Sequence, residues 1–187
     1  GPPENDRVTE TPRTRTESGM NVPEILRIPF ESFERNARVN RVTLATIKPA
    51  DLLYGDSAGG FNIGQHIADI VSFRPEWLSR IAPDHAASIP SVMSESSPTW
   101  LSTDDINVLQ AAFDAGDAAC KAAVLEAVRE GRSFERVYQA HPAHFIQHCI
   151  VHDSHHRGQI LALLRQSGRP TEEREKLETA SWPIWRE

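Results

Sequence analysis

Two stretches in the first half of the chain carry apolar residues at steps of three and four positions, the spacing that gathers them on one face of a helix. The first runs from Val22 to about Ile47. The second follows Asn62, a residue type that caps helix N-termini, and we expect Pro75 to kink or end it. Residues 49–60 between them, rich in Gly, Asp and Ser, are predicted to form a loop.

Two more helices are predicted in the second half. The third begins at Ser102 or Thr103, which can act as its N-cap, and ends at Gly131. The fourth begins at Pro142, because proline is well tolerated as a first helical residue, and ends at Gly168. No stretch shows the two-residue alternation of a strand. The predicted fold is therefore all-α, an antiparallel four-helix bundle.

The segments outside these helices define the expected domain. Residues 82–101 are rich in Pro and Ser, and we expect a long connection that crosses the end of the bundle between the second and third helices. Residues 1–20 have almost no bulky apolar side chains, which predicts a disordered tail, and Gly1-Pro2 resembles a protease-cleavage scar. We expect one domain over residues 21–187.

Composition narrows the choice of partners and compartment. The chain of 187 residues has a formal net charge of −6, which disfavours direct binding to nucleic acid phosphates. No apolar stretch approaches the roughly 20 residues that a membrane span needs. Only two cysteines are present, outside any metal-binding spacing, so we expect no disulfide framework and a cytoplasmic location.

Most of the eight histidines lie between His141 and His156. With Phe145 and Leu163 taken as the centre of the apolar face of the fourth helix, an advance of about 100° per residue places His152 and His156 within roughly 20° of that centre. The same geometry puts three others on a flank, facing a helix seam or the solvent: His144, His148 and His155.

A buried imidazole is costly unless its nitrogens find partners, and a metal ion supplies one for each ring. Histidines four residues apart on a helix, such as His152 and His156, can converge on one ion. His66 shares a face of the second helix with Ile63 and Ile67, so it can add a third nitrogen and leave coordination positions open. The competing interpretation is a set of separately hydrogen-bonded core histidines.

Other residues near this cluster have several interpretations. His148 also lies four residues from His152, and it can be an alternative ligand, a base behind the ligands or a surface residue, of which we favour the last. As general acid or base, His148, Gln65 and Asp69 are candidates by helical proximity alone, and the sequence identifies no catalytic residue among them.

Two charged residues of the fourth helix are predicted to lie away from the core. Asp153 falls about 80° from the apolar centre, which argues against a metalloprotease interpretation of the HDSHH run. Arg157 falls about 120° away, which favours a surface or interface role. No acidic residue is therefore expected on the central stripe of this helix, and the sequence offers no obvious fourth ligand.

The run from His152 to Leu161, HDSHHRGQIL, resembles the last-helix signature HxxHHRGQ of the DinB/YfiT-like proteins. The resemblance implies a metal triad made of His152, His156 and His66, and a bundle of up-down-down-up order with one long crossover. It also implies a zinc or nickel ion, a homodimer, and an aromatic tail (Trp182 to Trp185) that packs back on the bundle. Relatives of this kind include thiol-dependent transferases, isomerases and amide hydrolases, and proteins induced by DNA damage or stress.

Two functions follow from this resemblance and the histidine pattern. In the first, the protein is an enzyme in which one divalent ion activates a water or a low-molecular-weight thiol against an unidentified small molecule, in hydrolysis or thiol-dependent transfer. In the second, the ion only clamps the second and fourth helices together, and a stress or DNA-damage response is carried by dimerisation or a partner contact.

Overall fold

The computed structural model describes residues 21–187, and the predicted tail over 1–20 lies outside the described residues. The described part is helical, with two isolated β-bridges and no strand. Its helices are α1 (Glu24–Thr46), the 3-10 helix η1 (Pro49–Leu53), α2 (Ile63–Ile81), α3 (Pro83–Ala86), α4 (Ile106–Arg129), α5 (Ala143–Gln166) and α6 (Thr171–Trp185). This confirms the all-α prediction.

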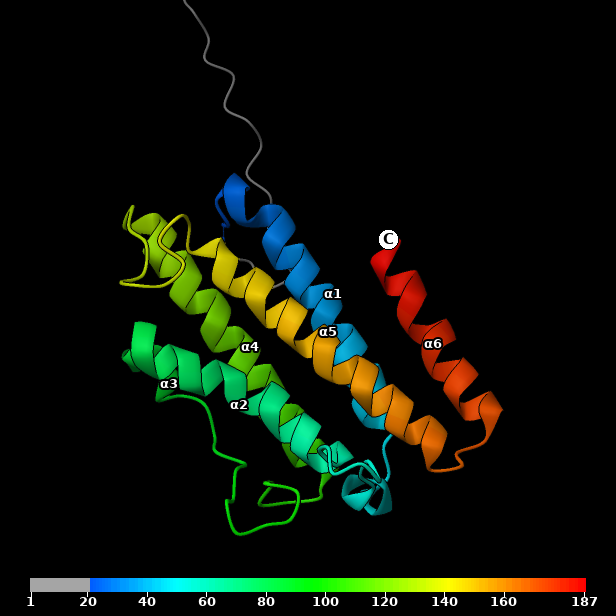
Figure 1. Ribbon diagram of the computed structural model, residues 1–187. Helices are drawn as coiled ribbons and strands as arrows, with labels where there is room; N and C mark the ends of the chain where they lie inside the picture. Colours follow the sequence, from blue (N-terminus) through cyan, green and yellow to red (C-terminus); the bar gives the residue numbers. More distant parts are fainter. Residues whose placement is uncertain (1–20) are drawn as a thin grey trace, which may run out of the picture.

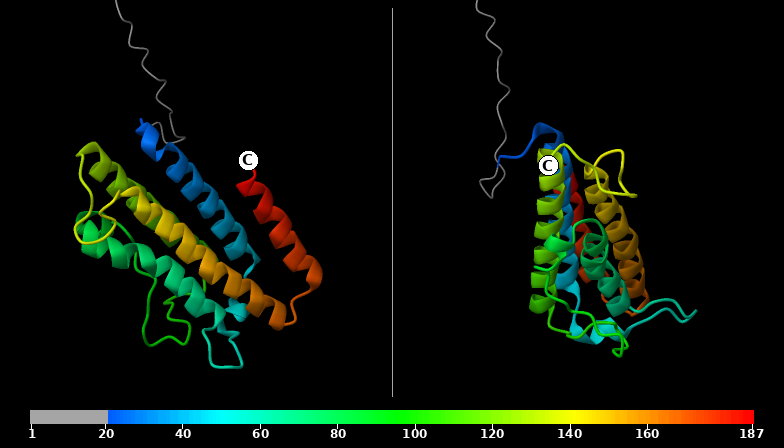
Figure 2. Two further views of the ribbon diagram at one scale, coloured as in Figure 1. Left: turned by 45° about the horizontal axis from the view of Figure 1, so that its top comes forward. Right: turned by 90° about the vertical axis from the view of Figure 1, so that its left-hand side faces the viewer.

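The four long helices α1, α2, α4 and α5 pack against one another, and α6 lies along α1 on the outside (Figure 1). Figure 2 shows the same arrangement from two further directions, with the connection after α3 looping outward at one end. None of the helices within residues 21–187 is long and apolar enough to cross a membrane.

The buried apolar side chains form two clusters at opposite ends of the helices. One includes Phe30 and Phe33 of α1 and Phe145 of α5. The other includes Ile67 of α2 and Ile160 of α5. On α1, α4 and α5 the two clusters are separated by roughly two to three turns, and most of the buried polar residues lie in those intervals.

The predicted start of the second helix is confirmed in detail. The side chain of Asn62 accepts a hydrogen bond from the Gln65 backbone N–H at 2.8 Å, and the Gln65 side chain accepts one from the Asn62 backbone at 2.9 Å. This reciprocal pair satisfies two N–H groups that a helix end otherwise leaves without partners. It fixes the first turn of α2, the turn that carries His66.

Three boundaries differ from the sequence prediction. Pro75 neither ends α2 nor starts a new helix, because α2 continues to Ile81 with Leu78 fully buried behind the proline. α4 begins at Ile106, since Asp105 rather than an earlier residue accepts the capping hydrogen bonds. The C-terminal aromatic segment, expected as a tail that packs back on the bundle, is part of a 15-residue helix, α6.

The residues between α3 and α4 pack closely on the start of α2 at Gly64. A Cβ added to Gly64 would lie 2.5 Å from the Cβ of Thr99, well inside van der Waals contact. We predict that Gly64→Ala lowers the free energy of unfolding by about 1–3 kcal/mol, the usual range for overpacking. Urea denaturation measures the change.

Gly158 of α5 provides the matched control, because a Cβ there meets nothing within 4 Å. Gly158→Ala should raise the free energy of unfolding by about 0.5–1 kcal/mol, through the higher helix propensity of alanine. Equal effects at the two glycines would mean that the contact with Thr99 does not constrain the chain.

Candidate metal centre

α2 and α5 lie side by side and bring two of the predicted ligands into contact. His66 is 3% exposed and His156 is 6% exposed. The Nδ1 atoms of the two rings are 2.9 Å apart, and they share one hydrogen bond. The prediction that both histidines point into the protein is therefore confirmed, although their residues lie 90 positions apart.

The third predicted ligand, His152, lies one turn before His156 on the same side of α5. Its ring centroid is 4.6 Å from that of His156, and it stacks on Phe73 of α2 at 4.1 Å. Its side chain is 22% exposed, so His152 sits at the edge of the core rather than at its centre. Its Nδ1 is buried and has no hydrogen-bond partner in the described part of the chain.

The environment keeps two of these imidazoles neutral at physiological pH. Burial, with the charges of His152 and His66, lowers the pKa of His156 to about 4. Burial also lowers the pKa of His66, helped by the charge of His155. A neutral ring keeps a nitrogen lone pair available, and metal binding requires that lone pair.

Asp69 is the acidic group nearest to the histidines. It lies one turn after His66 on α2, and its Oδ2 is 3.7 Å from Nε2 of His156. Burial raises the pKa of its carboxyl, while the charge of His152 opposes the rise. The carboxyl is one-third exposed, so it faces both the histidines and the solvent.

Gln65 and His148, the other predicted candidates for a general acid or base, form hydrogen bonds outside the group of three histidines. Gln65 is held in the cap of α2. His148 is exposed, and its Nδ1 shares a hydrogen bond of 2.7 Å with the Tyr138 hydroxyl. His155 is exposed as well and contacts Gln159, which confirms its predicted position off the core.

Aromatic side chains border the site beside His66. The ring of Phe61 lies 5.5 Å from the His66 ring and 4.9 Å from the indole of Trp100, which comes from the α3–α4 connection. Phe61 is 39% exposed, so an apolar surface meets the solvent next to the histidines. The sequence analysis did not predict this apolar surface, because Phe61 and Trp100 come from loops, where apolar residues show no helical spacing.

A buried ion pair lies directly behind the histidines. Asp153 of α5 and Arg74 of α2 are both fully buried, and the guanidinium donates to both carboxylate oxygens at 2.7 and 2.6 Å. Burial alone would raise the pKa of Asp153, but the charge and hydrogen bonds of Arg74 hold it well below its usual range. The prediction that Asp153 lies off the core is therefore wrong.

Residues of α1 extend this ion pair into a layer of buried polar side chains, here called the polar layer. Its members are Asn36, Asn40, Arg74, Asp153 and Arg157. Asn36 and Asn40 each donate to Oδ2 of Asp153, at 2.7 and 2.9 Å. Arg157 donates through Nη1 to the side-chain oxygens of the same two asparagines, at 2.7 and 2.6 Å. Arg157 is only 8% exposed, so its predicted surface role is wrong as well. The layer thus ties α1, α2 and α5 together at the level of the histidines.

Asp117 of α4 extends the layer and makes it pH-dependent. Burial raises the pKa of Asp117 to about 6 from its ordinary 3.8, although Nε of Arg74 lies 2.9 Å from its Oδ1 and opposes the rise. A raised pKa in the folded state favours folding fully below about pH 4, and the benefit is lost as the pH rises through 6. We predict that Asp117→Asn gains stability relative to the wild type between pH 4 and 7.

Urea denaturation of both proteins across that pH range measures the difference. Because every other titratable group is present in both proteins, subtraction leaves the contribution of Asp117. A difference that stays flat from pH 4 to 7 would contradict the prediction.

The described residues contain no group of three or more His, Cys, Asp or Glu side chains already arranged around a single ion. What the structure does bring together is a pair of contacting histidines, a third histidine one turn away and a carboxylate beside them. This set can bind a cation, or it can relay a proton between neighbouring imidazoles.

Comparison with known proteins gives a family. No curated protein and no solved structure matches the chain. The DinB family matches it over residues 20–187, which includes every helix described above and all of the site residues. The chain therefore belongs to the DinB family.

Proposed function

We propose that His66, His152 and His156 bind one divalent metal ion, zinc or nickel, and that the protein is a metal-dependent enzyme. The contact between His66 and His156 is the observation that carries this proposal. Two nitrogens bound at about 2.1 Å to one tetrahedral ion lie about 3.4 Å apart. The two Nδ1 atoms are 2.9 Å apart, so a shift of a few tenths of an ångström would accommodate an ion.

The chemistry of the donor set supports the same proposal. His152 has a buried ring nitrogen without a partner, and such a nitrogen costs free energy unless something binds it. The nearest acceptor, Oδ1 of Asp153, accepts from Arg74 and lies 4.0 Å from that nitrogen, beyond hydrogen-bond distance. The His152 ring, whose centroid lies 4.6 Å from that of His156, would supply the third imidazole.

The reaction that we propose is hydrolysis or thiol-dependent transfer on a small molecule. A bound divalent ion supplies a nucleophile near neutral pH, by lowering the pKa of a water or thiol bound to it. Asp69, whose Oδ2 lies 3.7 Å from Nε2 of His156, would be the base that takes the proton of that nucleophile. The exposed ring of Phe61 can hold an apolar part of the substrate beside His66.

The position of Asp69 also favours a second function. A carboxylate 3.7 Å from His156 can move in as a fourth ligand and close the site. Closed four-ligand sites are structural. The ion would then only hold α2 against α5, and a stress or DNA-damage response would depend on a partner contact.

Metal analysis of the purified protein tests the triad. After loading with zinc or nickel and dialysis, we expect about one ion per chain in the wild type. His152→Ala and His156→Ala should each reduce this to background, because two remaining imidazoles hold an ion weakly.

His155→Ala is the matched control, since His155 belongs to the same turn but is exposed. It should retain the ion. Full occupancy in His152→Ala and His156→Ala, or equal loss in His155→Ala, would contradict the triad.

Two generic assays separate the enzyme from the clamp. Hydrolysis of p-nitrophenyl acetate tests the water-dependent reaction, and conjugation of glutathione to 1-chloro-2,4-dinitrobenzene tests the thiol-dependent one. We expect one of them to require the loaded ion and both His152 and His156. A protein that binds the ion but catalyses neither reaction would favour the clamp.

We further propose an up-down-down-up order of the four long helices and a homodimer. Figure 1 supports the order, because α2 and α4 both start at the end of the bundle where α1 finishes. The segment between α2 and α4 would then be the long crossover. Size-exclusion chromatography with light scattering tests the homodimer.

A further inference from the structure

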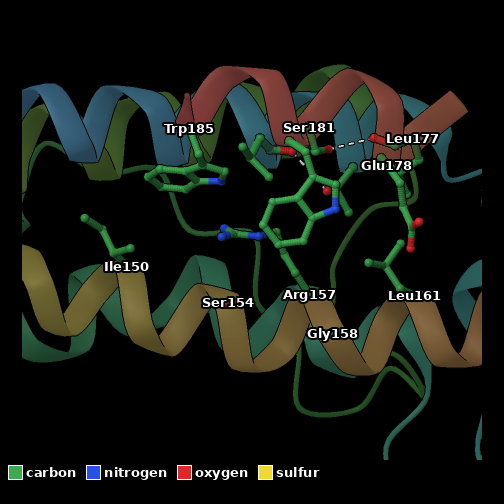
Figure 3. A pocket seen from close by; sticks show the side chains of 12 residues that line it. Ile150, Ser154, Arg157, Gly158, Leu161, Leu177, Glu178, Ser181 and Trp185 are labelled. Carbon is green, nitrogen blue, oxygen red and sulfur yellow. Dashed lines mark hydrogen bonds between the residues drawn. The ribbon is translucent and has the colours of Figure 1, made fainter. Parts of the chain in front are cut away.

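A cavity of about 360 Å³ lies between α6 on one side and α1 and α5 on the other. Its apolar walls include Leu161 of α5, with Leu177, Trp182 and Trp185 of α6. Figure 3 shows Trp185 and Leu177 on α6 facing Ile150 and Leu161 on α5 across this space. A water occupies about 30 Å³ in the liquid, so the cavity has room for roughly a dozen water-sized groups.

The cavity is separate from the candidate metal centre. Its α5 residues, such as Ser154 and Leu161, lie on the side of the helix about 140–180° from His152 and His156 at about 100° per residue. The histidines face α2, whereas the cavity faces α6. An inference about the cavity therefore goes beyond the proposed metal-dependent reaction and does not depend on it.

One buried charge points into this space. Arg157 projects from α5 toward α6 (Figure 3). Its Nη1 is bound by Asn36 and Asn40, but its Nε and Nη2 have no hydrogen-bond partner among residues 21–187. The Arg157 side chain is only 8% exposed, and its Nε and Nη2 are not among the fully buried polar atoms that lack a partner, so these two donors are open to the cavity and available to an acceptor that enters it.

The other polar groups of the cavity do not neutralise this charge. The hydroxyls of Thr43 and Ser181 donate to carbonyls of their own helices, Val39 and Leu177. Glu178 lines the cavity but is exposed, and within residues 21–187 it forms no ion pair with Arg157. Within the described residues, Arg157 is thus the buried charge of the cavity, and a single carboxylate lies at its rim.

We propose that this cavity binds a small monocarboxylic acid with an apolar body. The ligand's carboxylate accepts from Nε and Nη2 of Arg157, the paired geometry that guanidinium groups favour. The apolar body lies against the indoles of Trp182 and Trp185 and against Leu161. Glu178 at the rim repels a second acidic group, so dicarboxylates are excluded.

Equilibrium dialysis of the full chain with radiolabelled octanoate tests the proposal. We expect saturable binding of one octanoate per chain at concentrations below about 1 mM. Unlabelled octanol has the same body but no charge, and it should compete at least about tenfold less well than unlabelled octanoate. Failure of octanoate to bind, or equal competition by octanol, would overturn the proposal.

A substitution that fills the cavity without breaking the polar layer locates the binding. Gly158 lines the cavity and has open space around its missing Cβ, so Gly158→Leu should fold normally and block the ligand. Glu175→Leu is the control, because Glu175 is exposed on α6 and does not line the cavity.

Octanoate affinity should fall at least about tenfold in Gly158→Leu and stay unchanged in Glu175→Leu. Circular dichroism and the thermal midpoint check that both variants are folded. Undiminished binding in folded Gly158→Leu would show that octanoate binds elsewhere and would overturn the assignment. Both variants should contain as much zinc as the wild type. A loss of octanoate binding without a loss of zinc therefore tests the cavity separately from the proposed metal site.

Discussion

Replacing Asp153 by alanine is expected to lower the free energy of unfolding by about 3–5 kcal/mol, the range for removing one partner of a buried ion pair. The variant leaves Arg74 fully buried without its bidentate acceptor. It also removes the acceptor shared by Asn36 and Asn40. Urea denaturation followed by circular dichroism measures the loss. Asp153→Asn, which keeps one acceptor but no charge, should fall between alanine and the wild type.

An exposed ion pair gives the matched control. Asp114 pairs with Arg41 at 3.1 Å, and both side chains are about half exposed. Asp114→Ala should cost less than about 1 kcal/mol, because water replaces the lost partner. A loss below about 1 kcal/mol for Asp153→Ala as well would mean that the polar layer does not hold α1, α2 and α5 together.

Replacing Asp69 by asparagine is expected to lower kcat/KM of the metal-dependent reaction by about 10²–10⁴-fold, the usual contribution of a general base. This expectation rests on the proposed function. The asparagine keeps the size of the side chain but cannot take a proton. Burial raises the pKa of the Asp69 carboxyl, which moves it toward the pH at which such a base works best.

Two measurements separate this role from a structural one. The metal content of Asp69→Asn should equal that of the wild type, because three histidines remain. Loss of the ion together with the activity would instead identify Asp69 as a fourth ligand and favour the clamp. Asp114→Asn, the same change at an exposed position of α4, should leave both readouts unchanged.

The helices were predictable because their signals are local. Apolar spacing located α1, α2, α4 and α5, and the Asn62 cap was placed correctly. Of the two outcomes predicted at Pro75, an end of the helix is wrong: a proline costs a helix one hydrogen bond, and burial of Leu78 beyond it offsets that cost. The residues of α6 include Glu172, Glu173 and Glu175 and carry a weak apolar stripe, so no helix was predicted there.

The direction in which α5 faces was predicted only in part. The prediction centred the buried face of α5 on Phe145 and Leu163, and this placed the charged residues Asp153 and Arg157 outside that face. Asp153 and Arg157 are nevertheless buried, because Arg74 and the asparagines of α1 satisfy them. The true buried face therefore includes both charges, and His152 moves to its edge.

Local sequence was enough to establish that the chain is helical, where most of its helices start and stop, and that His66 and His156 point inward. These properties follow from spacing and capping within a few residues. Folding of the whole chain decided the rest: the polar layer behind the histidines, the carboxylate beside them and the cavity under α6. Each needs groups brought together from different helices, and a charge such as Asp153 becomes stable in the core only when partners 79 to 117 positions away meet it there.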